Sequence, residues 1–261
     1  MNNKNKMDEK IKVEKFAKLL FTDMDNTLLG NDESLSRLTK AIKKSKTKIG
    51  VGIASGRNIH SIQERLNETD FLTPDIIISS VGSEIFIKSD SEQQFVELID
   101  WNKEIADGWD RDEIVSSLEN IDDMELQGEA DQMEFKISYH INENTDLEKV
   151  KSQLNKLKQE TKLIASKNKD LDILPKKSGK GKAIEFLLRR FAISGDEIVV
   201  AGDSGNDEDM LTIGTPAVVV ANHSEELNKL EGNEKIFFAE KEYAAGILEG
   251  LQHFKFFENT K

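Results

Sequence analysis

Short apolar runs, each of strand length and each ending at a polar cluster, constrain the fold of this chain most strongly. Residues 18–22 end at Asp23, residues 49–54 end at Ser55, and residues 75–79 form a third such run. Segments with helical spacing of apolar residues separate these runs. Fully apolar strands that alternate with helices are typical of a parallel sheet covered on both faces. We therefore expect an α/β fold with a Rossmann-like core.

The middle of the chain has a different pattern. In residues 134–140 apolar and polar side chains alternate, which indicates an antiparallel strand with one solvent-facing side. After this block, residues 170–174 lead into a turn at 178–181, and residues 197–201 form another buried strand, so the parallel pattern has resumed. We therefore expect an α+β cap domain at 86–169, inserted into a discontinuous core domain of 17–85 and 170–257. Trp101 and Trp109 fit either the core of this cap or a platform for a sugar ring.

Composition excludes several classes of function. The chain has 36 Lys and Arg against 49 Asp and Glu, a formal net charge of −13, which argues against nucleic acid or an anionic membrane as partner. It has no cysteine, so thiolate catalysis and Cys-ligated metals are excluded. No apolar stretch approaches the ~20 residues of a membrane span, and residues 1–15 lack the apolar core of a secretory signal. We expect a cytoplasmic protein.

The polar clusters fall where a parallel sheet binds its ligands, beyond the carboxyl ends of the strands. Several carboxylates without cysteine favour a hard cation, and Mg²⁺ fits this preference best. A hydroxyl, a glycine amide, a helix N-terminus and a lysine suit a phosphoryl group. An aspartate beside both could attack phosphorus and form an acyl phosphate. Taken singly, each cluster also fits a turn or a helix cap, and a lysine in such a place also fits a solvated surface residue.

Four motifs in this order resemble the haloacid-dehalogenase superfamily of phosphohydrolases. They are the sequence DMDNT at 23–27, Ser55, Lys180, and the sequence GDSGND at 202–207. The insertion resembles the type IIB cap of that superfamily. Further stretches are similar to the sucrose-phosphate phosphatases within it: residues 19–27, 54–60, 81–85, 136–140, 169–175 and 244–253.

The resemblance implies a role for each matching residue. Asp23 would be the nucleophile and Asp25 the general acid and base. Lys180 would pair with the nucleophile and the phosphate, although Lys182 is near enough to leave that assignment open. Phosphate would also contact Ser55, Gly56 and Asn26. Mg²⁺ would bind Asp23, the backbone carbonyl of Asp25, and Asp203, with Asp207 in the outer shell. The implied substrate contacts are Arg57, Ser83, Glu84, Lys136 and His140.

The activity implied is Mg²⁺-dependent hydrolysis of a disaccharide phosphate, foremost sucrose 6-phosphate, through an aspartyl-phosphate. Mannosylfructose phosphate, a glycosyl-phosphoglycerate and less specific sugar-phosphate hydrolysis are alternatives. A phosphomutase would use the same core, and a catalytically dead binding module is opposed by the presence of Asp23 and Asp25. The resemblance further implies a monomer whose partner besides the sugar phosphate is a sucrose-phosphate synthase or a related glycosyltransferase.

Overall fold

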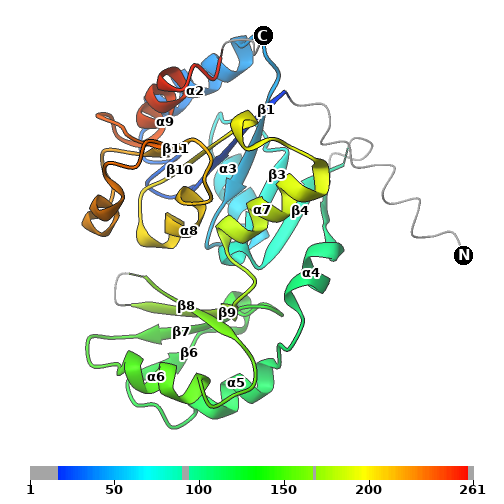
Figure 1. The fold of residues 1–261 in the computed structure, drawn as a ribbon, viewed down its shortest axis with the longest axis vertical. Helices are drawn as coiled ribbons and strands as arrows, with labels where there is room; N and C mark the ends of the chain where they lie inside the picture. The colour runs from blue at the N-terminus through cyan, green and yellow to red at the C-terminus, as the bar shows by residue number, and fades with distance from the viewer. Residues whose placement is uncertain (1–16, 90–93, 167–168, 258–261) are drawn as a thin grey trace, which may run out of the picture. The chain divides into compact units, whose positions relative to one another are not determined.

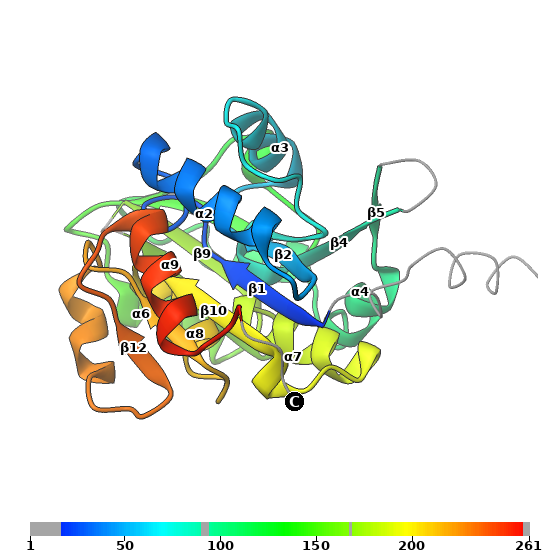
Figure 2. The same cartoon turned by 90° about the horizontal axis from the view of Figure 1, so that it is seen from above.

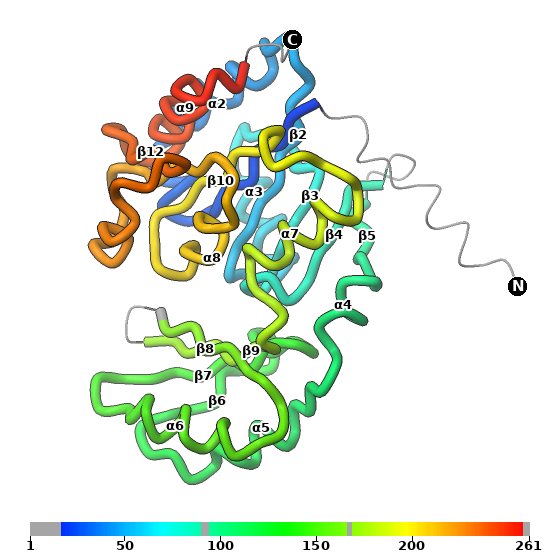
Figure 3. The backbone as a smooth tube through the Cα atoms, in the orientation of Figure 1, coloured from blue at the N-terminus to red at the C-terminus, as the bar shows by residue number. Residues whose placement is uncertain are grey.

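The computed structural model describes residues 17–89, 94–166 and 169–257, and Figure 1 shows the path of the chain. The chain divides into two compact units. The first consists of Met1–Leu98 together with Lys180–Lys261, and the second is Ile99–Gly179. Figure 3 traces the backbone through both units. Within the described ranges, no helix is both long enough and apolar enough to cross a membrane.

The first unit is built on an eight-stranded sheet in the order β12-β11-β10-β1-β2-β3-β4-β5. The strands from β12 to β3 run parallel, and β4 and β5 are each antiparallel to the preceding neighbour. The strand bounds are β1 Lys18–Thr22, β2 Ile49–Ala54, β3 Ile76–Ser79, β4 Glu84–Lys88, β5 Phe95–Glu97, β10 Ile198–Gly202, β11 Ala217–Val219 and β12 Ile236–Phe238. All residues of β1, β2 and β10 are buried, as expected for a sheet covered on both sides.

Helices cover both faces of this sheet. On one face lie α2 (Asp32–Lys44), α3 (Ile59–Asn67) and α9 (Tyr243–His253), and α2 and α9 run side by side (Figures 1 and 2). Their apolar residues share one core cluster with Leu20, Val51 and Val199 of the sheet. Figure 2 shows α7 (Lys180–Phe191) and α8 (Glu208–Leu211) on the other side of the strands. The carboxyl ends of the parallel strands β1, β2 and β10 therefore lie at the same edge of a sheet whose two faces are covered by helices.

The second unit is a four-stranded antiparallel sheet in the order β6-β7-β9-β8. Helices α5 and α6 supply apolar side chains that share a core cluster with β7 and β9. The bounds are α4 Ile99–Ile105, α5 Arg111–Leu118, β6 Met124–Leu126, β7 Ile137–Ile141, α6 Leu147–Leu154, β8 Thr161–Ser166 and β9 Asp170–Pro175. The predicted fold class is thus confirmed: a mixed α/β protein with a largely parallel main sheet and a separate antiparallel sheet.

The division between the units differs from the expected boundaries of 85/86 and 169/170. Strand β5 pairs with β4 in the eight-stranded sheet, so the first unit continues to Leu98. Strand β9 pairs with β7 and β8, so the second unit continues to Gly179. The expected boundary placed residues 170–174 in the core domain, although Asp170 and Asp172 alternate with apolar residues there. The burial of β9 alternates along the first residues, as in a strand with one open face.

Candidate active site

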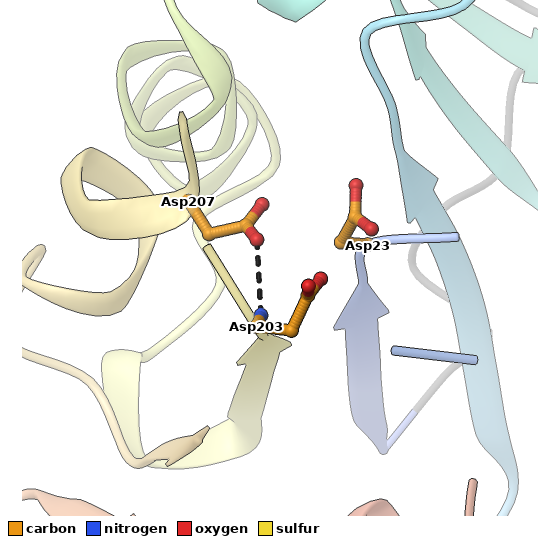
Figure 4. A group of neighbouring side chains, drawn as sticks. All are labelled: Asp23, Asp203 and Asp207. Atoms are coloured by element: carbon orange, nitrogen blue, oxygen red, sulfur yellow. Dashed lines mark hydrogen bonds between the residues drawn. The ribbon is translucent and has the colours of Figure 1, made fainter. Parts of the chain in front are cut away.

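Two aspartates follow neighbouring strands at the carboxyl edge of the sheet. Strands β1 and β10 pair in parallel, and the backbone N–H of Asp23 continues the pairing by donating to Ala201 O at 2.9 Å. Asp203 comes directly after β10, so the two side chains leave adjacent strand ends (Figure 4). The hydroxyl of Thr27 donates to Oδ1 of Asp203 at 2.7 Å. The register of two buried strands therefore fixes the spacing of these carboxylates.

Asp207 joins them from the turn that leads into α8. Its Oδ2 accepts hydrogen bonds from the backbone N–H groups of Asp203 and Ser204, at 3.1 and 3.2 Å. This close approach needs a glycine at the end of β10, because a Cβ on Gly202 would lie 2.5 Å from the Cβ of Asp207. One carboxylate oxygen from each of Asp23, Asp203 and Asp207 lies within 4.8 Å of the other two, and all three residues are buried.

Lys180, the first residue of α7, lies between two of these carboxylates. Its Nζ donates to Oδ1 of Asp23 and to Oδ1 of Asp207, both at 2.6 Å, and its side chain is fully buried. Burial alone would lower the pKa of Lys180, but attraction to Asp207 and Asp23 and the two hydrogen bonds raise it above its ordinary value, so the ammonium is charged. Lys182 is exposed and pairs with Glu185. The structure thus makes Lys180 the lysine of this cluster.

The cluster holds an excess of negative charge. Burial raises the pKa of Asp23 to about 8 against the attraction of Lys180, and repulsion from Asp207 and Asp203 adds to the increase. Three buried carboxylates face one ammonium, and buried charge of one sign is costly unless it is neutralised. A divalent cation with oxygen ligands would restore neutrality. Lys180 and two backbone N–H groups donate to both oxygens of Asp207, which fits its predicted place in the outer shell of the metal.

The segment after β2 follows the strand that lies next to β1 in the sheet. The backbone N–H of Ser55 donates to Ile78 O at 2.9 Å, and its Oγ accepts from the N–H of Arg57 at 3.2 Å. A Cβ on Gly56 would meet only Val81 Cγ2, at 3.7 Å, so packing does not require glycine there. Asn26 has a positive φ of 62°, a conformation that Asn adopts more readily than most residues. The phosphate contacts expected of Ser55, Gly56 and Asn26 stay predictions.

Asp25 lies outside the group of three carboxylates that are within 4.8 Å of one another. Both of its carboxylate oxygens accept hydrogen bonds from Arg57, Oδ2 from Nε at 2.7 Å and Oδ1 from Nη2 at 3.0 Å. The guanidinium predicted to contact substrate is therefore engaged by the predicted general acid and base. The expected metal contact of Asp25 concerned its backbone carbonyl, and that stays a prediction.

The turn after β3 holds Ser83 and Glu84 in different settings. Oε2 of Glu84 accepts hydrogen bonds from the hydroxyls of Ser79 and Ser80, at 2.7 and 2.9 Å. The hydroxyl of Ser83 is buried and has no hydrogen-bond partner in the described structure. Val81, two residues before Ser83, has a positive φ of 58°, a strained conformation for a β-branched residue. Its N–H donates to Ser55 O at 3.0 Å, which ties this turn to the segment after β2.

In the second unit, Lys136 and His140 lie at either end of the same polar row. Nζ of Lys136 is 3.5 Å from Oδ1 of Asp172, and the lysine side chain is only 8% exposed. His140 is exposed, with Nδ1 3.2 Å from Oδ1 of Asp170. The alternation around β7 predicted that both would face solvent, which is wrong for Lys136. Their contact with substrate stays a prediction.

The two tryptophans of this unit differ in surroundings. Trp101 of α4 is buried. Trp109 is partly exposed, packs against the core cluster of the second unit, and donates from Nε1 to Glu134 O at 2.8 Å. Trp101 therefore fits the core role rather than an open platform for a sugar ring.

Two residues that hold the site, Thr27 and Asn222, were not predicted from the sequence. Thr27 bonds Asp203, as described above, and it lies inside the motif at 23–27. Asn222 donates from Nδ2 to Asn26 O at 2.7 Å, and its Oδ1 accepts from the N–H of Tyr243 at 2.9 Å. It thereby links the segment after β1 to the start of α9. Its position shortly after β11, at the same edge of the sheet, is the signal that would have identified it.

Comparison with known proteins agrees with this geometry. Residues 16–255 match the family model described as sucrose-6F-phosphate phosphohydrolase. The chain is 30% identical over 260 residues to sucrose-phosphatase 1 of Nicotiana tabacum, a match that covers 93% of this chain and 60% of the tobacco protein. It is 31% identical over 243 residues to mannosylfructose-phosphate phosphatase of Agrobacterium fabrum, covering 90% and 96% of the two chains.

Solved structures show the same likeness. The sucrose-phosphatase of a Synechocystis species, determined in complex with sucrose and phosphate, superposes with a TM-score of 0.84 at 28% identity, covering 92% of this chain and 98% of that one. A haloacid dehalogenase-like hydrolase of Bacillus subtilis, with a TM-score of 0.69 at 20% identity and 95% of each chain covered, shares the fold. Since the family model matches nearly the whole chain, the protein belongs to the sucrose-6F-phosphate phosphohydrolase family, within the haloacid dehalogenase-like fold.

Proposed function

We propose that this protein is a Mg²⁺-dependent phosphatase that releases phosphate from a disaccharide phosphate, foremost sucrose 6-phosphate. The observation that carries the proposal is the buried cluster in which Lys180 bonds Asp23 and Asp207 at 2.6 Å, beside Asp203. Such a cluster combines three carboxylates that suit a divalent metal with an ammonium that suits a phosphoryl group. Membership of the family supports the same reaction.

The chemistry proceeds in two displacements. A carboxylate oxygen of Asp23 attacks phosphorus, the bond from phosphorus to the sugar oxygen breaks, and Asp25 gives its proton to the departing oxygen. Water then attacks the phosphorylated Asp23, Asp25 takes the proton of that water, and phosphate leaves. Lys180 holds Asp23 throughout, and Ser55, Gly56 and Asn26 contact the phosphoryl oxygens. When bound to Asp23 and Asp203, Mg²⁺ supplies positive charge that stabilises the negative charge of the phosphoryl group.

Two substrates have specific support. Sucrose 6-phosphate is favoured by the family match and by the Synechocystis relative, whose structure holds sucrose and phosphate. Mannosylfructose phosphate is favoured by the Agrobacterium relative, because the match extends over 96% of that protein. The tobacco sucrose-phosphatase is longer, and the chain spans 60% of its length. In either case we assign recognition of the sugar to Lys136, His140, Ser83 and Glu84. A wrong sugar would leave some of these polar groups without a hydrogen-bond partner, and this cost weakens its binding.

A panel of sugar phosphates tests the proposal. Release of inorganic phosphate would be measured with sucrose 6-phosphate, mannosylfructose phosphate, a glycosyl-phosphoglycerate and glucose 6-phosphate, each with Mg²⁺ and with EDTA. We expect the highest kcat/KM with sucrose 6-phosphate and no turnover in EDTA. Equal rates with glucose 6-phosphate would contradict a disaccharide substrate. Transfer of phosphate to a second position on the sugar, without free phosphate, would identify a phosphomutase instead.

A further inference from the structure

The side chain of Arg57 is fixed from two sides. Two of its nitrogens bond the two carboxylate oxygens of Asp25, and a third, Nη1, donates to the hydroxyl of Ser61 in α3 at 3.1 Å. Two parallel contacts between a guanidinium and a carboxylate define the plane of the carboxylate as well as its position. The side chains of Arg57 and Asp25 are each 42% exposed, so water reaches the pair.

This contact matters because Asp25 stands apart from the other carboxylates. Asp23, Asp203 and Asp207 are held by buried donors, whereas Asp25 follows the end of β1 on a segment that turns through the positive φ of Asn26. A general base must direct an oxygen lone pair at the proton it takes, and small errors in such geometry cost about 10²-fold in rate. An orienting group is therefore expected beside Asp25, and Arg57 is the residue with that geometry.

We propose that Arg57 is a positioning residue, which orients the Asp25 carboxylate to take the proton from the water that hydrolyses phosphorylated Asp23. The inference rests on the proposed function. In that step the water oxygen bonds to phosphorus, the bond from phosphorus to the Asp23 oxygen breaks, and its electron pair returns to the Asp23 carboxylate. The proton of the water goes to Asp25. The guanidinium donates to both carboxylate oxygens of Asp25, and this pair of contacts fixes the orientation of the carboxylate for this step.

A positioning role for Arg57 has different measurable consequences from the contact with substrate that the sequence resemblance implies. If Arg57 serves the second displacement, its loss slows hydrolysis of the phosphorylated enzyme more than its formation. With p-nitrophenyl phosphate, whose leaving group departs without strong need of an acid, the phosphorylated enzyme then accumulates. A residue that binds the sugar would leave this substrate unaffected, and a residue that only supports the fold would lower both steps.

The experiment compares wild-type protein with Arg57→Ala and Arg57→Lys, using p-nitrophenyl phosphate and Mg²⁺. Samples at steady state are quenched in acid, and the phosphorylated fraction is measured by intact mass. For Arg57→Ala we expect kcat to fall about tenfold to a hundredfold and the phosphorylated fraction to rise several-fold. Because slowing the second displacement alone leaves kcat/KM unchanged, KM should fall together with kcat. Arg57→Lys keeps the charge but not the two parallel contacts, so its values should lie between.

Arg65→Ala is the matched control. Arg65 lies on the same helix as Ser61 and forms an exposed ion pair with Glu68 at 2.7 Å, so its loss should change neither quantity. Added guanidinium ion at millimolar concentration should restore part of the turnover of Arg57→Ala, whereas urea should not. Circular dichroism of each variant establishes that the fold is retained.

Three results would overturn the inference. A phosphorylated fraction that stays constant or falls in Arg57→Ala would show that Arg57 does not serve the second displacement. A raised KM for the sugar phosphate, with unchanged kcat and an unchanged phosphorylated fraction, would return Arg57 to substrate binding. Wild-type protein that releases no phosphate from any sugar phosphate with Mg²⁺ would refute the proposed function itself, and this distinguishes failure of the proposed function from failure of the inference.

Discussion

Replacing Asp203 with Asn is expected to stabilise the metal-free protein while abolishing its response to Mg²⁺. Above the raised pKa of Asp23, about 8, three buried carboxylates and the single ammonium of Lys180 leave an excess of two negative charges at the site. Asn keeps the shape of the side chain, and its Oδ1 can still accept the hydrogen bond from Thr27. The substitution therefore removes charge and leaves the packing in place.

The expected size follows from the distances within the site. Two unit charges 4.8 Å apart repel by about 3.5 kcal/mol at an effective dielectric constant of 20. Asp203 is repelled by two carboxylates and attracted by Lys180, so about one such repulsion is relieved, less what is lost from other contacts of Asp203. We expect the free energy of unfolding to rise by about 1–3 kcal/mol, which corresponds to an increase in Tm of a few degrees.

The increase in the free energy of unfolding should depend on pH because Asp23 titrates in the same cluster. The folded-state pKa of Asp23 is raised from 3.8 to about 8, so its contribution to stability is complete below pH 4 and is lost as the pH rises toward 8. Asp203 is one cause of the increase, so the Asn variant should lose less stability over this range. The advantage of the variant is therefore expected to be small near pH 4 and largest at pH 8 and above.

Thermal unfolding at pH 5 and pH 8, in EDTA and in excess Mg²⁺, tests this reasoning. Wild-type protein should gain stability from Mg²⁺ at pH 8, by about 2.7 kcal/mol when the ion is at a hundred times its Kd, and the variant should gain little. The control is Asp196→Asn, which makes the same charge change at an exposed position. A variant less stable than wild type in EDTA at pH 8 would refute the excess of charge. An undiminished response to Mg²⁺ would remove Asp203 from the metal site.

Three further outcomes are expected. Asp23→Asn should abolish turnover with the fold retained on circular dichroism, since an amide cannot attack phosphorus; residual activity near the wild-type rate would contradict the covalent route. Gly202→Ala should destabilise the protein by about 1–3 kcal/mol and lower kcat, because the new Cβ would lie 2.5 Å from the Cβ of Asp207, as denaturant titration and phosphate release would show. Lys136→Met should raise KM for sucrose 6-phosphate without changing hydrolysis of p-nitrophenyl phosphate; equal losses on both substrates would show that the buried Lys136–Asp172 pair serves the fold instead.

The central strands could be predicted because each is buried on both faces and reads as a plain apolar run. The expected run at 49–54 coincides with β2, and that at 18–22 coincides with β1. Strands at the margins of the sheets lack this signal. Strand β5 has three partly buried residues, and β6 has three residues of which two are exposed, so neither forms a recognisable pattern. Their pairing partners alone define them as strands.

The positions of the candidate site residues at the ends of the central strands could be predicted, but the contacts of their side chains could not. Strand ends could be placed at one edge of the sheet from topology, which located Asp23, Ser55 and Asp203. Whether Lys180 or Lys182 enters the site depends on the direction in which α7 begins. That direction is set by packing: a Cβ on Gly181 would lie 2.2 Å from the backbone oxygen of Asp209, so helices α7 and α8 approach closely at that point. Contacts of this kind join residues distant in sequence, and no local pattern encodes them.

The net charge of the buried cluster also could not be predicted from the sequence, because it depends on contacts between residues distant in the chain. A count of carboxylates in the motifs gives four, and this number suggests a larger negative charge than the buried cluster has. The bond from Arg57 removes Asp25 from the cluster and pairs its charge, and Lys180 offsets one of the three that remain. Once Asp23 is ionised, the two negative charges that are left match the charge of one divalent ion. The pairing of Arg57 with Asp25 thus separates the group assigned to proton transfer from the groups assigned to the metal, although Asp23 and Asp25 lie two residues apart on one short segment.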